Sequence, residues 1–152
     1  MFVPDDFDPP ATPTRVSAAG RAFRLTPLGV EHNERDHGAW MSSIDHIRAT
    51  PGFAGRDWPH EMSLADNADD LVAHADDFEA RHGFTYTVLD RDDDVIGCVY
   101  IYPDDEGVHD VHVRSWVRAD RADLDGPLRM AVLRWMRTDW PFADIRYAGV
   151  ER

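Results

Sequence analysis

The sequence has no lysine, a single cysteine and no long apolar run. The single thiol, Cys98, can form neither an intramolecular disulfide nor a cysteine-based zinc cluster. We also expect no metal site. No stretch approaches the roughly 18 apolar residues of a membrane-spanning helix. The acidic, proline-rich start MFVPDDFDPP also lacks the basic-then-apolar pattern of a secretory signal. We therefore expect a cytoplasmic protein that does not bind a membrane.

The charge that is present is mostly negative and unevenly distributed. The 152 residues carry 29 acidic side chains against 16 arginines, a net charge of −13. This balance argues against binding to nucleic acids or anionic membranes, which require basic surface. Residues 1–113 hold 8 arginines and 23 acidic residues, whereas residues 114–137 hold 6 arginines and 3 aspartates. The short positive segment is either an ordinary helix surface or a local anion site.

Hydrophobic periodicity predicts one domain over residues 23–152, preceded by a proline-rich acidic tail over residues 1–22. Apolar stripes with helical spacing alternate with runs of β-branched and aromatic residues. The predicted strands cover residues 23–28, 84–89, 95–102, 108–117 and 144–150, and the predicted helices cover residues 31–50, 64–78 and 127–139. The order β-α-α-β-β-β-α-β predicts an α+β fold: one mixed, mostly antiparallel sheet of about five strands, flanked by three helices.

The fourth of these strands has two different faces. One face carries Val111, Val113, Ser115 and Val117, and the other carries Asp110, His112, Arg114 and Trp116. Because side chains alternate along a strand, the valine face should meet the core and the polar face should meet a cleft. The segment that follows, Arg118–Gly126, reads as a polar loop, and Pro127 suits the first turn of a helix.

That order of elements resembles the core of the GNAT superfamily of N-acyltransferases, over residues 23–150. In that family the fourth strand leads into a loop of the form Gln/Arg-x-x-Gly-x-Gly/Ala, which opens a long helix. The matching stretch here is Arg121-Ala-Asp-Leu-Asp-Gly126, in which Leu124 replaces the first glycine. The resemblance implies that backbone amides of this loop and helix hold the diphosphate of acetyl-CoA or another acyl-CoA. The positive segment, residues 114–137, covers this loop and most of the helix that follows it.

The resemblance implies an N-acetyltransferase that uses acetyl-CoA and no metal. The cofactor residues would be Trp116, Val117, Arg118, Arg121, Ala122, Leu124, Gly126, Leu128 and Arg129. Asp123, Asp125 and Pro127 depart from the family pattern, so a non-catalytic GNAT-like binding or regulatory module is the alternative. Family members usually add a helix and two strands after the position of Arg152. Without them we expect the open sheet edge to be covered either by the N-terminal tail or by a partner subunit in a homodimer.

The same resemblance suggests the catalytic and acceptor residues. Asp110 lies eleven residues before Arg121, at the position of a family general base, although it also reads as an ordinary strand-end aspartate. His112 is a second candidate base, and Tyr147 is the nearest candidate acid. The acidic region before residue 108 favours a small cationic amine as acceptor. The residues expected to bind it are Trp40, Trp58, Glu61 and Tyr102, with the two tryptophans as core residues in the alternative interpretation.

Overall fold

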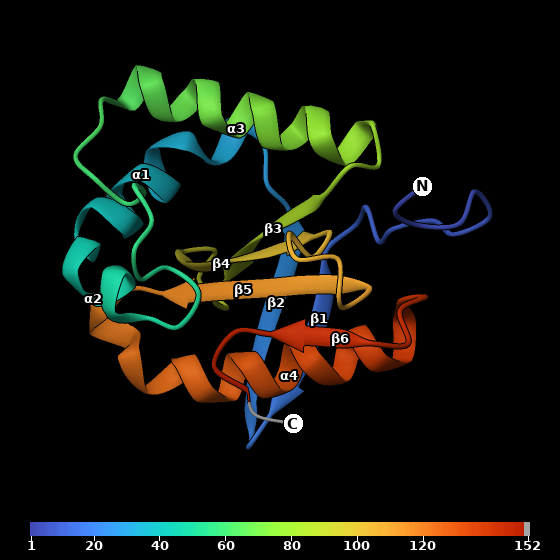
Figure 1. Ribbon diagram of the computed structural model, residues 1–152. Helices are drawn as coiled ribbons and strands as arrows, with labels where there is room; N and C mark the ends of the chain where they lie inside the picture. The colour runs from blue at the N-terminus through green and yellow to red at the C-terminus, as the bar shows by residue number, and fades with distance from the viewer. Residues whose placement is uncertain (151–152) are drawn as a thin grey trace.

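The computed structural model describes residues 1–150, which form one sheet with helices on both faces (Figure 1). The strands are β1 (Thr14–Ala18), β2 (Arg21–Pro27), β3 (Phe84–Leu89), β4 (Val95–Tyr102), β5 (Val111–Val117) and β6 (Ile145–Tyr147). The helices are α1 (Asn33–Met41), α2 (Ile44–Ala49), α3 (Leu64–Glu79) and α4 (Asp125–Asp139), with short 3-10 turns η1 (Val30–His32) and η2 (Ala119–Leu124). The strands lie in chain order, all antiparallel except the parallel pair β5–β6.

Within residues 1–150 the sheet thus has six strands and the fold has four α-helices, one more of each than the sequence predicts. The extra strand is β1, which lies in the expected tail and pairs with β2, so that Val16 opposite Phe23 becomes buried. The extra helix arises because the predicted helix over residues 31–50 breaks at Ser43. The φ of −132° at Ser43 leaves the helical region, and its Oγ accepts a hydrogen bond from the Ala119 backbone N–H, 2.8 Å away.

The segment before β1 also packs against the domain. Val3 is only 2% exposed and joins the core. The Tyr86 hydroxyl donates to the carbonyl oxygen of Pro10 at 2.7 Å, and the Arg81 guanidinium donates to the carbonyl of Phe7. Residues 1–13 are therefore held by buried contacts and by hydrogen bonds to their backbone, as well as by their chain connection.

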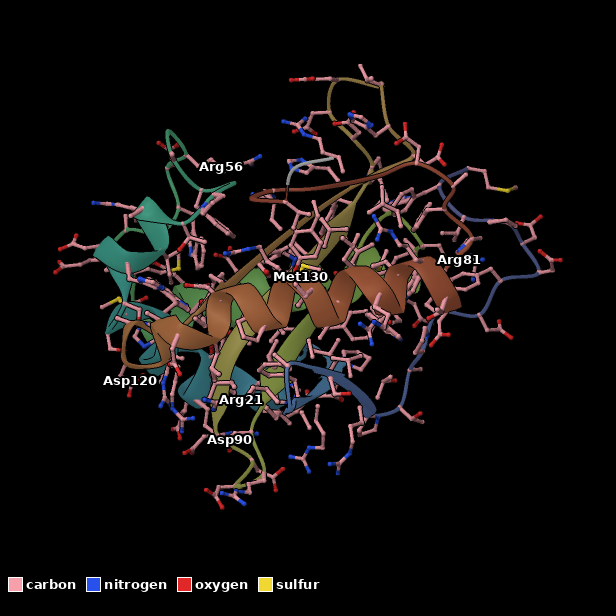
Figure 2. All side chains as sticks on the ribbon, turned by 90° about the horizontal axis from the view of Figure 1, so that it is seen from below. Arg21, Arg56, Arg81, Asp90, Asp120 and Met130 are labelled. Atoms are coloured by element: carbon pink, nitrogen blue, oxygen red, sulfur yellow. The ribbon has the colours of Figure 1, made fainter. Side chains whose placement is uncertain are left out.

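The two faces of the sheet carry separate cores. Leu128, Val132 and Met136 of α4 pack on one face together with the valines of β5, as the alternation in the sequence predicts. On the other face, Trp40 of α1 and Leu71 of α3 pack with residues of β4 and β5. Figure 2 views α4 from its solvent side, where Met130 points away from the sheet and is 53% exposed. None of the helices within residues 1–150 is long and apolar enough to cross a membrane.

Strand β5 continues past the end of its partner β6. The pairing of β5 with β6 ends where Val113 lies opposite Tyr147, and one further hydrogen bond joins the Ala148 N–H to the Val113 carbonyl. The Arg118 N–H bonds to the Ile96 carbonyl next to β4. Because backbone groups alternate between the two sides of a strand, those of Ser115 and Val117 point away from β4, beyond the last residue of β6.

Candidate functional site

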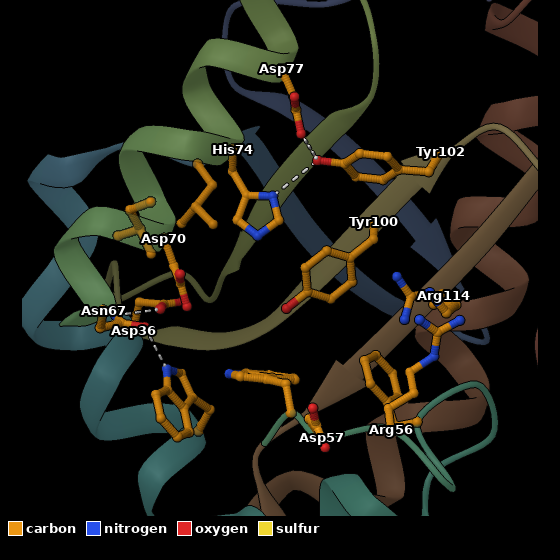
Figure 3. A pocket seen from close by; sticks show the side chains of 15 residues that line it. Asp36, Arg56, Asp57, Asn67, Asp70, His74, Asp77, Tyr100, Tyr102 and Arg114 are labelled. Carbon is orange, nitrogen blue, oxygen red and sulfur yellow. Dashed lines mark hydrogen bonds between the residues drawn. The ribbon is translucent and has the colours of Figure 1, made fainter. Parts of the chain in front are cut away.

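A cavity of about 520 Å³ lies between the sheet and helices α1 and α3, on the face opposite α4 (Figure 3). Aromatic rings form its apolar walls: Trp40, Phe53, Trp58 and Tyr100. The acidic and basic side chains at its lining are Asp36, Asp57, Asp70, Asp77, His74, Arg56 and Arg114. A concave apolar site with a few convergent polar groups is the usual form of a small-molecule site.

His74 of α3 is held by a chain of hydrogen bonds at the edge of this cavity. The Tyr102 hydroxyl donates its one proton to Asp77 Oδ2 at 2.9 Å, because a carboxylate oxygen accepts. The Tyr102 oxygen and Thr85 Oγ1 each lie 3.0 Å from His74 Nδ1. With the Tyr102 proton given to Asp77 and the Thr85 hydroxyl donating to the Tyr102 oxygen, both oxygens can accept from the imidazole. We therefore assign the ring proton to Nδ1, and Figure 3 shows the other ring nitrogen pointing into the cavity.

The environment keeps His74 neutral. Burial lowers the pKa of its imidazole below the usual 6.5, and Arg114 lowers it further, while Asp77 and Asp70 act in the opposite direction. A neutral imidazole with its proton on Nδ1 has a free lone pair on Nε2. The cavity therefore contains a side chain that can accept a proton near neutral pH.

Asp36 of α1 is a nearly buried carboxylate in the same cavity, only 4% exposed. Burial raises its pKa to about 6, although the Asn67 amide donates to its Oδ2 at 3.1 Å and opposes the shift. The orientation of Asn67 is fixed, since its oxygen accepts from Trp40 Nε1 and its nitrogen also donates to Asn33. Asp36 is thus mostly ionised at neutral pH with little solvent around it, an arrangement that a cation would stabilise.

Arg114 of β5 and Arg56 provide positive charge in the cavity. The Arg114 guanidinium lies over the rings of Phe53 and Tyr100, 5.4 and 5.5 Å from their centroids. Burial lowers the pKa of Arg114, and the nearby Arg56 lowers it further. Among residues 1–150, neither guanidinium has a carboxylate within 4 Å or a hydrogen-bond acceptor.

Solved structures share this arrangement of sheet and helices. They include Mycobacterium smegmatis RimJ in complex with CoA-disulfide, with 12% identity and a TM-score of 0.68 over 89% of this chain and 66% of RimJ. The ribosomal-protein-S5-alanine acetyltransferase of Vibrio fischeri has 17% identity and a TM-score of 0.56 over 80% of this chain and 67% of that one. MccE, the microcin C7 self-immunity acetyltransferase in complex with acetyl-CoA and AMP, has 12% identity and a TM-score of 0.57, over 76% and 61%.

The chain has the GNAT acyltransferase fold. The resemblance drawn from its element order is therefore confirmed at the level of fold. No family model and no curated protein sequence matches the chain. This chain spans 66% of the length of RimJ and 66% of that of a ribosomal-protein-serine acetyltransferase structure from Vibrio cholerae.

Three of the four expected acceptor residues meet at the cavity. Trp40, Trp58 and Tyr102 line it, and the rings of Trp40 and Trp58 lie 5.4 Å apart. Trp40 belongs to the core cluster of this face, as the alternative interpretation expects, and Trp58 is half-buried and packs against that cluster. Glu61 lies elsewhere, in a separate hollow beside His46.

The expected catalytic residues lie outside the cavity lining. Asp110 Oδ2 accepts the backbone N–H groups of Ala143 and Asp144, at 3.0 and 2.9 Å, and so fixes the turn before β6. His112 shares the cavity face of β5, where its Nε2 is buried without a hydrogen-bond partner among the described residues. Burial lowers the pKa of His112, and three arginines lower it further, while Asp104 acts in the opposite direction. The Tyr147 hydroxyl donates to Ser115 Oγ at 2.7 Å, and burial raises the pKa of this tyrosine.

Most of the expected cofactor residues already have partners within the chain. Trp116, Val117 and Leu128 are completely buried, and Leu124 points into the core beneath α4. Arg118 pairs with Asp120 at 3.0 Å, and Arg121 lies 3.3 Å from Asp90. Ala122 is exposed, and Gly126 has open space where a Cβ would lie. The Arg118 amide is used by β4, so the outward backbone groups of β5 belong to Ser115 and Val117.

Asp125 is the central polar residue at the start of α4. Its Oδ2 lies 2.8 Å from His46 Nε2 of α2, and its Oδ1 lies 3.9 Å from the guanidinium of Arg129. Arg129 is the last of the nine expected cofactor residues. Burial raises the pKa of Asp125, while His46, Arg129 and the backbone N–H of Val117 oppose that shift. This carboxylate therefore occupies the space between the start of α4 and the free edge of β5.

The most specific residues of the cavity were not predicted from the sequence, although α3 contains a signal for them. Asn67, Asp70, His74 and Asp77 recur at intervals of three and four residues, which puts them on one face of the helix. That face also carries Leu71, which is 2% exposed. Polar residues that follow the same stripe as a buried leucine indicate a polar cavity beneath the helix.

Proposed function

We propose that the protein is an acyl-CoA-dependent N-acetyltransferase that acts on a small cationic amine. The observation that carries the proposal is His74, a neutral imidazole whose free nitrogen faces an acidic cavity in a GNAT fold. The cavity supports a small-molecule acceptor by its size, about 520 Å³. Two of the solved structures above are named for a ribosomal protein and for a microcin, so the fold alone leaves the kind of acceptor open.

The start of α4 fits the diphosphate end of a CoA. Leu124 points into the core and leaves the outer side of the loop free, and Gly126 has open space beside its backbone. The helix is 15 residues long, so its N-terminal amides favour an anion. The residues that would hold the group are Arg121, Gly126 and Arg129. When bound, the cofactor supplies an activated acetyl thioester.

The free edge of β5 would hold the arm of the cofactor through the backbone groups of Ser115 and Val117. One side chain occupies this edge: the Asp125 carboxylate accepts from the Val117 N–H. The Tyr147 hydroxyl bonds to Ser115 Oγ on the core face of the strand, so this bond leaves the backbone groups of Ser115 free. Binding would therefore require the Asp125 side chain to turn away from the edge.

The chain's own residues supply the remaining functions in the cavity. Asp36 and Asp70 attract the ammonium form of the acceptor. His74 Nε2 then accepts a proton from the ammonium and leaves the amine able to attack. The resulting imidazolium is stabilised because its Nδ1–H donates to the Tyr102 oxygen, whose own hydroxyl proton is donated to Asp77. We assign the base to His74 rather than to Asp110, whose carboxylate is engaged with backbone amides outside the cavity.

The proposal is tested by incubating the full chain with acetyl-CoA and a panel of amines while thiol release is measured. His74→Gln should lower kcat/KM by about 10²- to 10⁴-fold, which is the usual contribution of a general base. In the unaltered protein, kcat/KM should fall as the pH drops through a value below 6.5, because protonated His74 cannot accept a proton.

Asp110→Asn and His112→Gln are the matched controls, because each residue was a candidate from the sequence. Both variants should retain thiol release and the fall of kcat/KM at low pH. A full loss in either variant with normal turnover in His74→Gln would refute the assignment of the base. The absence of thiol release with every amine would refute the proposed activity itself.

The second candidate function is a GNAT-like module that binds a ligand without catalysis. It is favoured by one observation: the Asp125 carboxylate accepts from the Val117 N–H, at the edge of β5 that a CoA arm would need. This function would be established if amines bind in the cavity while CoA produces no thermal shift at millimolar concentration. A homodimer through the open sheet edge and a cytoplasmic location remain part of the proposal.

A further inference from the structure

Arg56 and Arg114 line the cavity without an acidic partner. Among residues 1–150 no carboxylate lies within 4 Å of either guanidinium. Arg114 is half-buried, and every other half-buried arginine in this part of the chain has an ion pair or a hydrogen-bond acceptor, as Arg118, Arg121 and Arg81 do. The two arginines also lie close enough that Arg56 lowers the pKa of Arg114. Two unpaired guanidinium groups beside each other indicate a place for an anionic group.

The geometry of Arg114 suits a planar anion. Its guanidinium lies over Phe53 and Tyr100 at 5.4 and 5.5 Å, and these rings restrict its orientation. A guanidinium held in this way loses little freedom when it forms the two parallel hydrogen bonds that a carboxylate accepts. Arg56 is exposed at the mouth of the cavity and can approach the same group from a second direction.

The opposite end of the cavity has the opposite charge. Figure 3 shows Asp36 and Asp70 on the side of α1 and α3, and the two arginines on the side of β5 and the loop after α2, with the Tyr100 ring between them. His74 lies toward the acidic end. Asp57 also lies beside Arg56, but its carboxylate is exposed and more than 4 Å from both guanidinium groups. The cavity therefore has one end with carboxylates alone and one end where the two guanidinium groups lie.

We propose that the acceptor is a zwitterion whose amine and carboxylate are separated by several bonds. Its ammonium group lies near Asp36 and His74, and its carboxylate is bound by Arg56 and Arg114. The role of the amine as acceptor rests on the proposed acetyltransferase function, whereas the binding of a zwitterion does not. A simple diamine would leave the two guanidinium groups unpaired, and a fatty acid would leave Asp36 unpaired.

The test measures binding to the full chain by calorimetry, without any CoA. The probes are three zwitterions of increasing length, β-alanine, γ-aminobutyrate and ε-aminocaproate, together with the diamines and fatty acids of the same chain lengths. Glycine is added as the zwitterion with only one carbon between its amine and its carboxylate. One of the three longer zwitterions should bind at least about tenfold more tightly than its matched diamine and fatty acid, because only it satisfies both ends of the cavity. Glycine should bind more weakly than that zwitterion.

Arg114→Gln and Arg56→Gln should each remove this preference and leave the affinity for the diamine unchanged or higher. Arg56 is exposed, so its variant should fold even if Arg114→Gln does not. Arg134→Gln, an equal change of charge on the exposed side of α4, should leave all affinities unchanged. Equal affinity for zwitterion and diamine, equal losses for both in the arginine variants, or no binding of any zwitterion at roughly 10 mM would overturn the proposal.

The outcome is separable from that of the proposed function. Zwitterion binding that requires both arginines, with no thiol release from acetyl-CoA, would support this ligand class and refute the enzyme. Thiol release with diamines alone would support the enzyme and refute the zwitterion.

Discussion

Asp36 shows how a single residue links the cavity to the stability of the fold. Its pKa is about 6 in the folded protein, against 3.8 for an ordinary aspartate, so the folded form holds a proton more tightly than the unfolded form. Between about pH 4 and pH 6 the folded state binds more protons, and its stability falls as the pH rises. Above pH 6 the cost of the buried charge is fully present.

Asp36→Asn should therefore stabilise the protein at pH 8 and have little effect below pH 4. The difference of about two pKa units sets a ceiling of ~3 kcal/mol on the gain. Urea unfolding of both proteins across this pH range measures it. Asp70→Asn, at an exposed carboxyl on the same cavity, should change the free energy of unfolding little. A gain for Asp36→Asn that is constant with pH would show that the effect comes from packing. The same variant should bind amines more weakly.

At this scale the sequence predicted large residues better than small polar ones. Trp40 and Trp58 could be placed beside the cavity because the resemblance assigns their helix and loop to the acceptor side of the fold, and both rings line that cavity. Asn67 and His74 could not, because each belongs to a hydrogen-bond network with partners from other elements. Asp110 was assigned by its spacing from Arg121, but spacing along a strand does not reveal that its carboxylate caps a turn thirty-odd residues later.

At the scale of elements, helix α4 and strand β5 lie close to the positions predicted for them from the sequence. The valine face of β5 meets α4, and the helix ends where the pattern predicts, at Asp139. The break between α1 and α2 was missed because it depends on Ser43, whose side chain binds the distant Ala119 amide. Likewise β1 was missed because residues 14–18 have only one buried side chain, Val16, and acquire their strand pairing from β2.

The start of α4 yields the prediction that belongs to this scale. Asp125 places a carboxylate between the first turn of the helix and the edge of β5, where it competes with any anionic ligand. Asp125→Asn removes the charge and can keep the hydrogen bond with His46. The affinity for CoA, measured by calorimetry, should rise about two- to tenfold.

Asp139→Asn is the control for this experiment, since it makes the same change at the opposite end of the same helix. It should leave the affinity for CoA unchanged. Equal affinity in the Asp125 variant and the unaltered protein would mean that this carboxylate does not compete for the site. Weaker binding would mean that it helps to hold the loop in a receptive form.

For the whole molecule, the dominant property is the net charge of −13. Mutual repulsion among acidic residues lowers the stability of the folded state, and salt screens it. The turn between β3 and β4 concentrates this charge, with Asp90, Asp92, Asp93 and Asp94 in five residues. Asp90 and Asp93 pair with Arg121 and Arg24, respectively, whereas Asp92 has no ion-pair partner among the described residues.

The melting temperature should therefore rise between 50 mM and 500 mM NaCl, concentrations over which the Debye length falls from about 14 to about 4 Å. Asp92→Asn should raise it at low salt, and the gain should shrink at high salt, because the removed repulsion is then already screened. Arg91→Gln changes an exposed neighbour in the same turn with the opposite sign and should lower the melting temperature at low salt. If both variants shift it in the same direction, local turn structure controls the stability of this region; opposite shifts that vanish with salt would establish that the excess negative charge does.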